Sequence, residues 1–358
     1  MRLKTIDALR GIASIYVVIF HMYLVLGDDM KGWLPDFFSL VFAHGYTGVD
    51  IFFVISGFVI ALSNRVPVVN AKYILNFAFR RSIRLDPPYW VALATEILLI
   101  YISARIYPEL KRNYPSLHQL GWHLLYMQNV MGYENIVAVY WTLCLEVQFY
   151  LVYIFVLGLF GKFAGFSVVR DDGGPNYWLI IPFYLITVYS ILCSLNWVPQ
   201  PYHGSFLTHW FEFFLGVVIC WCIFDQLTSR YFWAYILLIS CTLLVKWNIG
   251  VAVGIVTAVF IYIVGSLKKY DSVLAWRPLL YFGSISYSLY LIHGSTGRRL
   301  ILLGKNLIGG PLNMFESIIL FLSGILVSIV AAHLLYTYVE RISVVFSKRF
   351  KLKNQPVK

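Results

Sequence analysis

The stretch FESIILFLSGILVSIVAAHLLYTY, residues Phe315–Tyr338, decides the fold class of this chain. It is 24 residues long and carries one acidic residue, Glu316, close to its start. A helix that crosses a membrane needs about 20 consecutive, mainly apolar residues, because it rises about 1.5 Å per residue through a hydrocarbon core of about 30 Å. The stretch therefore predicts a membrane-spanning helix.

Similar apolar stretches recur along the whole sequence. We predict an all-α polytopic membrane protein of about ten transmembrane helices, built as one domain (residues 1–358) with a short basic tail at about 341–358. The segment 116–130 is amphipathic and is expected at the membrane interface. The other nine predicted spans are Leu9–Leu26, Gly45–Leu62, Pro88–Tyr107, Val139–Phe160, Tyr177–Leu195, His209–Phe224, Tyr231–Val245, Gly250–Leu267 and Leu279–Leu300.

The overall composition supports a membrane protein and excludes several other classes. Apolar residues make up 60% of the chain and charged residues only 13%, whereas a soluble domain carries about 25% charged residues. A soluble enzyme, a disordered chain and a DNA-binding domain are therefore poor interpretations. The cysteines all fall within apolar stretches, which argues against a disulfide framework or a zinc site.

Basic residues predict the orientation in the membrane. With the N-terminus in the cytoplasm, 20 of the 28 Lys and Arg residues fall in the cytoplasmic loops and tails, and 8 fall outside. This bias predicts that both termini are cytoplasmic in a multi-pass protein of the cell inner membrane. It also explains the net charge of +11 through topology and attraction to anionic lipid, without a nucleic-acid partner.

Arg10 and His21 are the first candidate functional pair. His21 follows Arg10 by eleven positions, so on a helix they share one face and lie roughly 16 Å apart along the axis. Ionisable groups within a membrane segment cost at least about 2.5–3.5 kcal/mol near its centre and are therefore functional candidates. His21 suits a general base or proton relay; the alternative is a structural core histidine beside an arginine that reaches the interface.

Acidic residues at a similar predicted depth form a second group. Asp50 enters the second span from outside, where its carboxylate would orient His21, or would simply cap a helix. Glu146 follows Trp141 in the fourth span, and we expect it in the outer half of the membrane. Together with His293 these side chains predict a site in the outer half, opposite the arginines.

Arg81 and Arg84 predict an anion site on the cytoplasmic side. Their i, i+3 spacing places them on one helix face, just before Pro88, where we expect a new helix to start. Arginine binds phosphate in a bidentate manner, so a phosphorylated cytosolic ligand such as a coenzyme A thioester suits the pair. The alternative is ordinary anchoring of a cytoplasmic loop.

The ninth span carries one further polar face. Ser286, Tyr290 and His293 recur at i, i+4 and i+7, with Tyr287 beside them. Aromatic residues of this kind can also form an ordinary interfacial belt. The sequence lacks a Walker A loop, a G-x-S-x-G elbow and an H-E-x-x-H motif, so ATPase, serine-hydrolase and zincin activities have no support, and no metal site is predicted.

Taken together, these motifs resemble those of the acyltransferase-3 family of integral membrane acyltransferases, which modify bacterial surface polysaccharides. The resemblance covers nearly the whole chain. Its pieces are Arg10-x10-His21, Gly48-Val-Asp50-Ile-Phe-Phe-x-x-Ser-Gly-Phe58, Arg81-x-x-Arg84 followed by Pro-Pro-Tyr-Trp, the string from Trp141 through Glu146 to Tyr150, and Ser286-Tyr-x-x-Tyr-Leu-x-His293.

The resemblance implies transfer of an acyl group, usually acetyl, from acyl-CoA to a hydroxyl of a glycan or glycosylated acceptor on the outer side. Acyl-CoA would be a co-substrate, and no permanently bound cofactor is expected. His21 would act as general base or transient acyl carrier, and the other residues implied in the site fall into three groups. These are Asp50 and Glu146 in catalysis, Arg10, Arg81 and Arg84 in donor binding, and Trp141, Ser286, Tyr287, Tyr290 and His293 in the acceptor pocket.

A proton-coupled transporter or flippase for a glycan or lipid-linked precursor is the alternative. Intramembrane His, Asp and Glu side chains suit such a carrier. Paired broken helices in matching halves, which are typical of carriers, are not evident in the sequence. The sequence leaves open the acceptor, the choice between an acetyl donor and a succinyl or longer one, and the oligomeric state.

Overall fold

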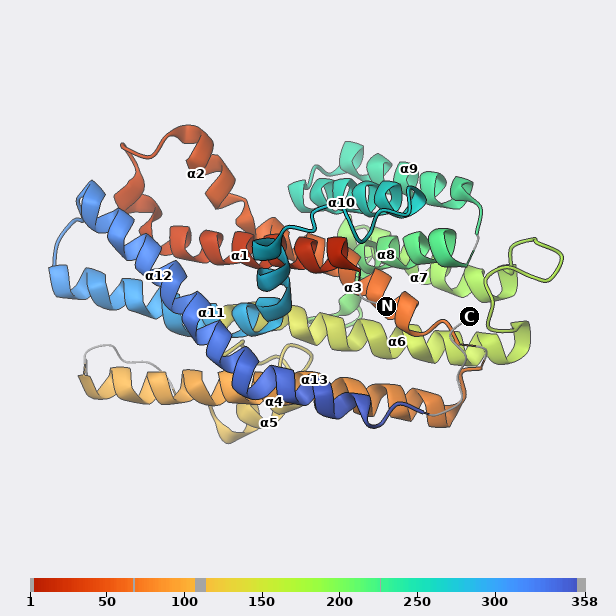
Figure 1. Cartoon of the computed structure of the whole chain (residues 1–358), viewed down its shortest axis with the longest axis horizontal. Helices are drawn as coiled ribbons and strands as arrows, with labels where there is room; N and C mark the ends of the chain where they lie inside the picture. The colour runs from red at the N-terminus through yellow and green to blue at the C-terminus, as the bar shows by residue number, and fades with distance from the viewer. Residues whose placement is uncertain (1–2, 67, 107–113, 226, 353–358) are drawn as a thin grey trace.

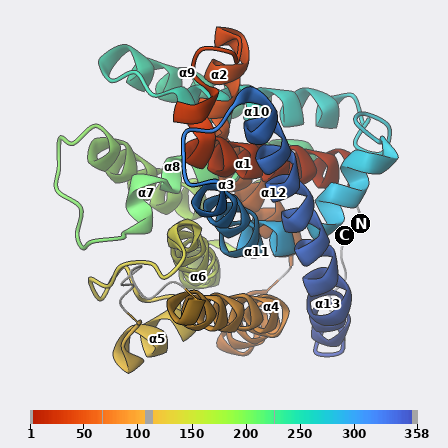
Figure 2. The ribbon, with the colours of Figure 1, turned by 90° about the vertical axis from the view of Figure 1, so that its left-hand side faces the viewer.

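The computed structural model describes residues 3–66, 68–106, 114–225 and 227–352. Within these ranges the regular secondary structure is helical, apart from one isolated bridge between Val169 and Pro175. The predicted all-α class is therefore confirmed. Figure 1 shows that most of the long helices run along the longest axis of the molecule, and Figure 2 shows α1, α3 and α11 in the middle of the bundle.

All ten predicted spans coincide with helices. Seven helical segments are long and apolar enough to cross a membrane, while α8, α9 and α11 fall short of that standard in length or composition. The count of ten spans and the cytoplasmic termini stay predictions; Tyr107 and the tail beyond 352 lie outside the described residues. The ten helices are α1 (Lys4–Met30), α3 (Gly48–Ser63), α4 (Ala71–Ile106), α6 (Trp141–Ala164), α7 (Tyr177–Ser194), α8 (Trp210–Phe224), α9 (Ser229–Val245), α10 (Ile249–Ser266), α11 (Arg277–Ile308) and α12 (Met314–Leu335).

Helix directions agree with an alternating path through the membrane. Helices α1 and α11 are parallel, because Gly11 packs on Gly283 near their starts and Lys305 binds Asp29 at 2.5 Å near their ends. Helix α3 is likewise parallel to α8. In the predicted order of spans, α1 is the first and α11 the ninth, whereas α3 is the second and α8 the sixth. Because successive spans alternate in direction, the two helices of each pair are expected to cross the membrane in the same direction.

Two glycines allow α3 and α8 to touch backbone to backbone. A Cβ atom added at Gly57 would lie 1.7 Å from the carbonyl oxygen of Phe213, and one at Gly216 would lie 1.9 Å from that of Val54. Small residues permit this kind of close approach between membrane helices. The contact fixes α3, with Asp50 near its start, against α8.

Helix α4 differs from its prediction. It runs without a break through Pro87 and Pro88, so the expectation that a new helix starts at Pro88 is wrong. Prolines remove helical hydrogen bonds, but neighbouring groups can satisfy the freed carbonyls in a membrane helix. The two prolines leave the carbonyls of Ile83 and Arg84 without their helical donors. The next carbonyl, that of Leu85, accepts a hydrogen bond of 2.9 Å from the Tyr287 hydroxyl, which ties this turn of α4 to α11. As a result, Arg84 lies within a long helix rather than in a loop.

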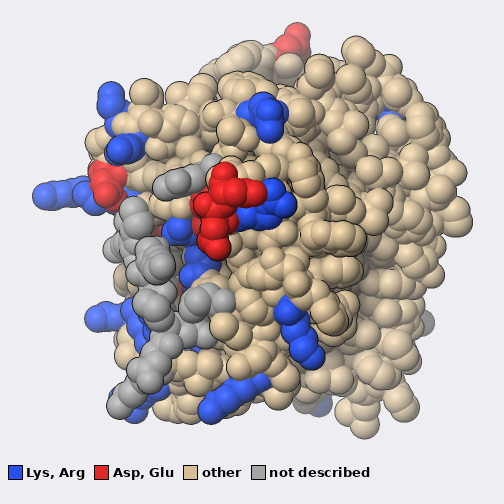
Figure 3. Space-filling model, turned by 90° about the vertical axis from the view of Figure 1, so that its right-hand side faces the viewer, with Lys and Arg blue, Asp and Glu red and all other residues tan. Residues whose placement is uncertain are grey.

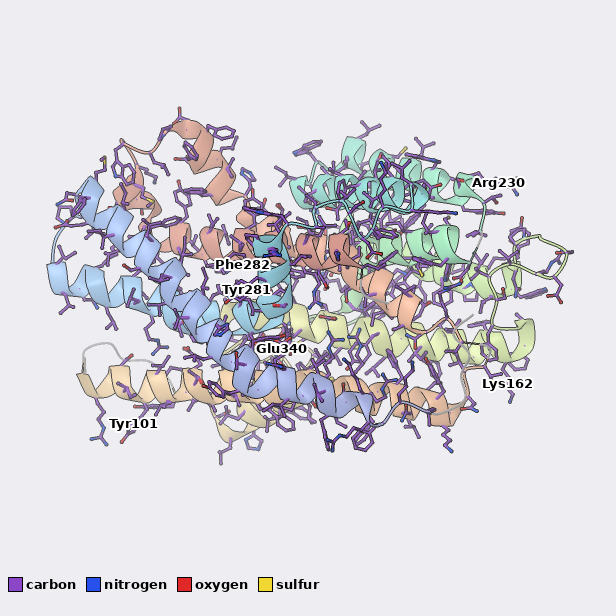
Figure 4. The ribbon with its side chains drawn as sticks, in the orientation of Figure 1. Tyr101, Lys162, Arg230, Tyr281, Phe282 and Glu340 are labelled. Carbon is purple, nitrogen blue, oxygen red and sulfur yellow. The ribbon has the colours of Figure 1, made fainter. Side chains whose placement is uncertain are left out.

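The chain after the tenth predicted span is also helical. Helix α12 continues through a π-helical turn at Tyr336–Glu340 into α13 (Arg341–Lys348), so the predicted basic tail begins as a helix. Glu340 is buried at this turn, and Figure 4 shows it near the middle of the molecule. The amphipathic segment contains the short helix α5 (Leu117–Leu124).

One end of the molecule carries the loops predicted to be cytoplasmic. Lys162 and Arg230 both lie at that end, whereas Tyr101, near the end of α4, lies at the opposite one (Figure 4). Figure 3 views the first end directly and shows Lys and Arg side chains distributed over it, with Asp and Glu side chains beside them. This arrangement agrees with the predicted basic bias of the cytoplasmic face.

Candidate active site

The predicted arginine residues meet in one cavity. We call it the arginine cavity; its volume is about 100 Å³, enough for several water molecules. Arg10 comes from α1, Arg81 and Arg84 from α4, and Glu146 from α6. The other lining residues are Val49, Phe52, Phe53, Ile55, Ser56, Val59, Leu85, Thr142, Leu143, Phe213, Ser286, Tyr287 and Tyr290.

Aromatic rings and one acidic group hold the arginines in place. The Arg81 guanidinium lies over the rings of Phe77 and Tyr150, 5.9 and 5.2 Å from their centroids. Glu146 accepts a hydrogen bond of 2.9 Å from Ser56 and interacts electrostatically with Arg81. Three arginines thus face one carboxylate in this cavity, which leaves an excess of positive charge suited to an anionic ligand.

A second acidic residue approaches the arginine cavity from the side. Glu340 accepts hydrogen bonds from the Ser288 hydroxyl at 2.6 Å and from its backbone N–H at 3.2 Å, and it interacts electrostatically with Arg10 and Arg84. Its side chain is 5% exposed. A π-helical turn often marks a functional site, and this one directs Glu340 toward the arginines as a counter-charge. The sequence analysis missed Glu340, although an acidic residue next to a predicted span was a usable signal.

A second cavity adjoins the first and contains His21. This histidine cavity has a volume of about 240 Å³. It shares Val49, Phe53 and Tyr290 with the arginine cavity, so the two spaces meet at these side chains. Its remaining lining residues are Val17, Phe20, His21, Tyr46, Asp50, Ala138, Val139, Trp141, His209, Asn248 and Gly250.

Tyr290 separates the two cavities. Its hydroxyl lies 2.7 Å from the Thr142 hydroxyl and donates to the Val139 carbonyl at 3.1 Å. Its ring packs edge-on against Phe52, with 5.8 Å between the ring centroids. Tyr290 thus lies between the arginines and His21, held by its hydroxyl and by its ring.

His293 contacts His21 directly. The His293 Nδ1 lies 3.0 Å from the Leu289 carbonyl, an acceptor, so Nδ1 carries the proton and Nε2 has a free lone pair. The His21 Nδ1 lies 2.9 Å from the Val17 carbonyl and 3.3 Å from the His293 Nε2. Both neighbours accept, which places the His21 proton on Nδ1 and leaves its Nε2 unprotonated. His21 is thus arranged as a base.

Asp50 does not orient His21 as expected. Both line the histidine cavity, but among the described residues no hydrogen bond joins them. Asp50 instead interacts with His209 and Glu212 at the start of α8. The physical reason is the glycine contact between α3 and α8, which brings Asp50 to α8, while His21 Nδ1 already faces two acceptors on α1 and α11. His209 and Glu212 were not predicted as site residues, although an acidic residue inside an apolar span was a usable signal.

Glu146 also lies elsewhere than predicted. It lines the arginine cavity, whereas Trp141 lines the histidine cavity beside His209, with 5.6 Å between their rings. Five helical residues separate Glu146 from Trp141, which is about 7.5 Å along the axis and a turn of about 140°. The structure therefore places Glu146 with the arginines rather than in the cavity of His21.

The remaining predicted residues lie on the same helix, α11. Ser286 and Tyr287 line the arginine cavity and Tyr290 lines both cavities, whereas His293 faces His21. Among the described residues, no group of three or more His, Cys, Asp or Glu side chains is arranged to hold a metal ion. The structure thus brings the predicted residues into two connected spaces instead of one outer pocket.

Comparisons with known proteins show the family of the chain. Residues 3–337 match a family model described as "Acyltransferase domain" (Acyl_transf_3). The chain is 24% identical over 380 residues to "Putative peptidoglycan O-acetyltransferase YrhL" of Bacillus subtilis, a match that covers 94% of this chain and 54% of the relative. It is 27% identical over 172 residues to "Peptidoglycan O-acetyltransferase OatA" of Listeria monocytogenes, covering 45% of this chain and 25% of the relative.

The chain is also similar to a third relative, but it matches no solved structure. The chain is 30% identical over 171 residues to "Putative membrane-bound transacylase BcsY" of Komagataeibacter xylinus, covering 44% of this chain and 38% of that protein. The matches thus span about half or less of the length of each relative. No solved structure matches the chain.

Proposed function

Because the chain belongs to the acyltransferase-3 family of integral membrane acyltransferases, we propose that it is a membrane O-acyltransferase. It moves an acetyl group from acetyl-CoA on the cytoplasmic side to a hydroxyl of a glycan on the outer side of the cell inner membrane. The names of its relatives, which include peptidoglycan O-acetyltransferases, support acetyl transfer to a glycan. The observation that carries the proposal is the pair of adjoining cavities, one rich in arginine and the other containing a histidine base.

The arginine cavity supplies the donor site. Coenzyme A carries several phosphate charges, and Arg10, Arg81 and Arg84 offer guanidinium groups that bind phosphate in a bidentate manner. Arg10 and His21 lie about 16 Å apart along α1. An extended pantetheine arm covers a distance of this order, so phosphates near the arginines would allow the thioester to pass Tyr290 and approach His21.

The histidine cavity supplies the base. His21 Nε2 would take the proton from the acceptor hydroxyl while the hydroxyl oxygen attacks the thioester carbonyl carbon. The carbon–sulfur bond then breaks, the thiolate of coenzyme A leaves, and His21 returns the proton to that sulfur. His293 would hold His21 in the required tautomer throughout. The alternative route, in which His21 carries the acetyl group itself, uses the same nitrogen.

The histidine cavity favours a small, uncharged acyl group. It has a volume of about 240 Å³, and none of the residues that line it in the described structure is Lys or Arg. A succinyl group would bring a carboxylate into this space beside Asp50, without a lining cation to compensate it. A long acyl chain would need the aromatic lining to move. An acetyl group carries no charge and is short, so it needs neither a compensating cation nor a movement of the aromatic side chains.

Binding of acetyl-CoA to the purified protein in nanodiscs tests the proposal. We expect saturable binding by the wild type, loss of binding in the Arg81→Ala/Arg84→Ala double variant, and transfer of radiolabelled acetyl to a glycan acceptor. A folded sample that binds neither acetyl-CoA nor longer acyl-CoAs would contradict the proposal. That result would favour the proton-coupled carrier, for which glycan transport into vesicles is the direct assay.

A further inference from the structure

A third cavity lies beside the histidine cavity on the side away from the arginines. Its volume is about 160 Å³, and it shares His209 and Asn248 with the histidine cavity. The loop between α7 and α8 and the turn between α9 and α10 form much of its wall, and both are predicted to face outward. Its other lining residues are Cys193, Ser194, Leu195, Asn196, Gln200, Thr208, Phe211, Glu212, Thr242, Lys246 and Val251.

Glu212 is the residue that needs a ligand in this cavity. Glu212 is 2% exposed, and apart from the neighbouring carboxyl of Asp50, which can donate only when it is protonated, its Oε2 atom has no hydrogen-bond partner in the described structure. Its Oε1 atom lies 3.4 Å from the Nδ1 of His209, a long contact. A buried carboxyl oxygen without a donor is costly. A hydroxyl group entering the cavity would supply the missing donor.

Asp50 extends the same polar surface into the histidine cavity. Its carboxyl interacts with Glu212 and His209, and a Cβ atom added at Gly250 would lie 2.5 Å from the Asp50 Oδ1. The absence of a side chain at Gly250 therefore leaves room for the Asp50 carboxyl. Polar groups thus continue from Glu212 through His209 to Asp50, and the Asp50 end lies in the cavity of His21.

We infer that Glu212, His209 and Asp50, together with Asn248, form an acceptor subsite for a neutral saccharide that enters through the third cavity. This inference rests on the proposed function in assigning the saccharide the role of acceptor. Sugar hydroxyls would donate to the two carboxyl groups, each of which keeps an accepting oxygen in either protonation state. The hydroxyl to be acylated would then lie toward His21.

Charge and ring chemistry select the class of ligand. Two neighbouring carboxyls disfavour an anionic sugar, because an ionised carboxyl would repel it at close range and a protonated one would supply no compensating positive charge. Lys246 at the third cavity donates one of its three N–H groups to the Ser194 carbonyl at 3.1 Å, which leaves two donors for sugar hydroxyls. The Trp141 indole beside His209 offers a flat apolar surface for a sugar ring. These features favour a neutral saccharide.

Direct saccharide binding tests the subsite without requiring acyl transfer. The probes are fluorescently labelled tetramers of N-acetylglucosamine and of glucose, both neutral, and a tetramer of galacturonic acid, which is anionic. Each is titrated against the intact protein in nanodiscs, and acetyl-CoA binding is measured on the same samples. The variants are Glu212→Gln and Asp50→Asn, and the matched control is Glu134→Gln, an exposed residue of the loop before α6.

We expect at least one neutral tetramer to bind more tightly than the anionic one, and each cavity variant to raise its Kd at least about tenfold, the effect of losing one hydrogen bond to a charged group. Acetyl-CoA binding by all variants, and tetramer binding by Glu134→Gln, should match the wild type. Wild-type saccharide binding by Glu212→Gln and Asp50→Asn would overturn the inference. Failure of both neutral tetramers to bind a sample that binds acetyl-CoA, or equal binding of the anionic tetramer, would also overturn it.

The same experiment separates this inference from the proposed function. If the neutral saccharide binds in a manner that depends on Glu212 and Asp50 but acetyl-CoA does not bind, the saccharide subsite stands and the proposed acyl transfer fails. If acetyl-CoA binds and its acetyl group reaches a glycan, while the carboxyl variants bind saccharide normally, the proposed function stands and the subsite fails.

Discussion

His293 Nε2 lies 3.3 Å from His21 Nδ1, and the two imidazole rings belong to the parallel helices α11 and α1. Because His293 donates through its other nitrogen to the Leu289 carbonyl, it can only accept from His21 while it is neutral. Together with the Val17 carbonyl, which lies 2.9 Å from the same His21 Nδ1, this contact keeps the His21 proton on Nδ1 and leaves Nε2 free to act as a base. It makes His293 a positioning residue.

Replacing His293 by alanine should therefore slow acyl transfer without weakening donor binding. We expect kcat to fall by up to about 100-fold, because the base loses its fixed orientation, while the Kd for acetyl-CoA stays unchanged. His293→Gln, whose amide oxygen can accept from His21, should recover part of the loss. His333→Ala, on the exposed face of α12, is the control. A wild-type kcat in His293→Ala would show that the contact has no role.

Arg81 and Arg84 should each contribute to acetyl-CoA binding. A hydrogen bond to a charged group contributes about 1.5–3 kcal/mol, so each alanine substitution should raise the Kd by about 10- to 100-fold. Binding should also weaken as salt is increased, since the attraction is electrostatic. Arg230→Ala, at the same end of the molecule as Lys162 (Figure 4), is the matched control. Equal affinities in the single variants and the control would place the donor elsewhere.

Replacing Glu340 should lower the thermal stability of the protein more when the donor site is empty than when it is occupied. Removing its charge by Glu340→Gln leaves Arg10 and Arg84 with less compensation, and unpaired buried charge is strongly destabilising. We expect a lower thermal midpoint without ligand, a larger upward shift on adding acetyl-CoA, and a donor affinity at least equal to that of the wild type. Differential scanning fluorimetry in detergent measures both shifts. A smaller ligand-induced shift than in the wild type would mean that Glu340 itself helps to bind the donor.

Gly57 should tolerate no side chain. An added Cβ would meet the Phe213 carbonyl oxygen at 1.7 Å, so α3 and α8 would have to separate. Overpacking of this kind costs about 1–3 kcal/mol or more, and the shift would also move Asp50 away from Glu212. Gly57→Ala should lower the thermal midpoint and the acyl-transfer rate together. Gly121→Ala, in α5 with nothing within 4 Å of the added atom, should do neither, and equal behaviour of the two variants would contradict this packing.

Much of the fold was predictable from the sequence because the membrane restricts the possible structures. Apolar stretches of sufficient length locate all ten helices, and the spacing of Arg10 and His21 places both on one face of α1. The helix containing Arg84 was harder to predict. Prolines normally mark a helix start, but α4 continues through Pro87 and Pro88 and is tied to α11 at this point by the hydrogen bond from the Tyr287 hydroxyl to the Leu85 carbonyl.

The candidate site was predicted less completely, since its pairings depend on helix packing. Depth alone grouped Glu146 and Asp50 with His21, whereas the structure places Glu146 beside Arg81 and Asp50 beside Glu212. The close contact at Gly57 selects the second pairing, and no local pattern in the sequence encodes which helix will pack against α3. Glu212 and Glu340 carried a usable signal, because acidic groups in or next to apolar spans are rarely incidental.

The most direct test of the account is single-turnover acetyl transfer by a His21→Ala variant that is folded and saturated with radiolabelled acetyl-CoA. We expect wild-type donor binding together with a rate of transfer to the glycan that is lower by about 10²- to 10⁴-fold, the usual contribution of a general base. Transfer at the wild-type rate by this variant would contradict the central role of His21.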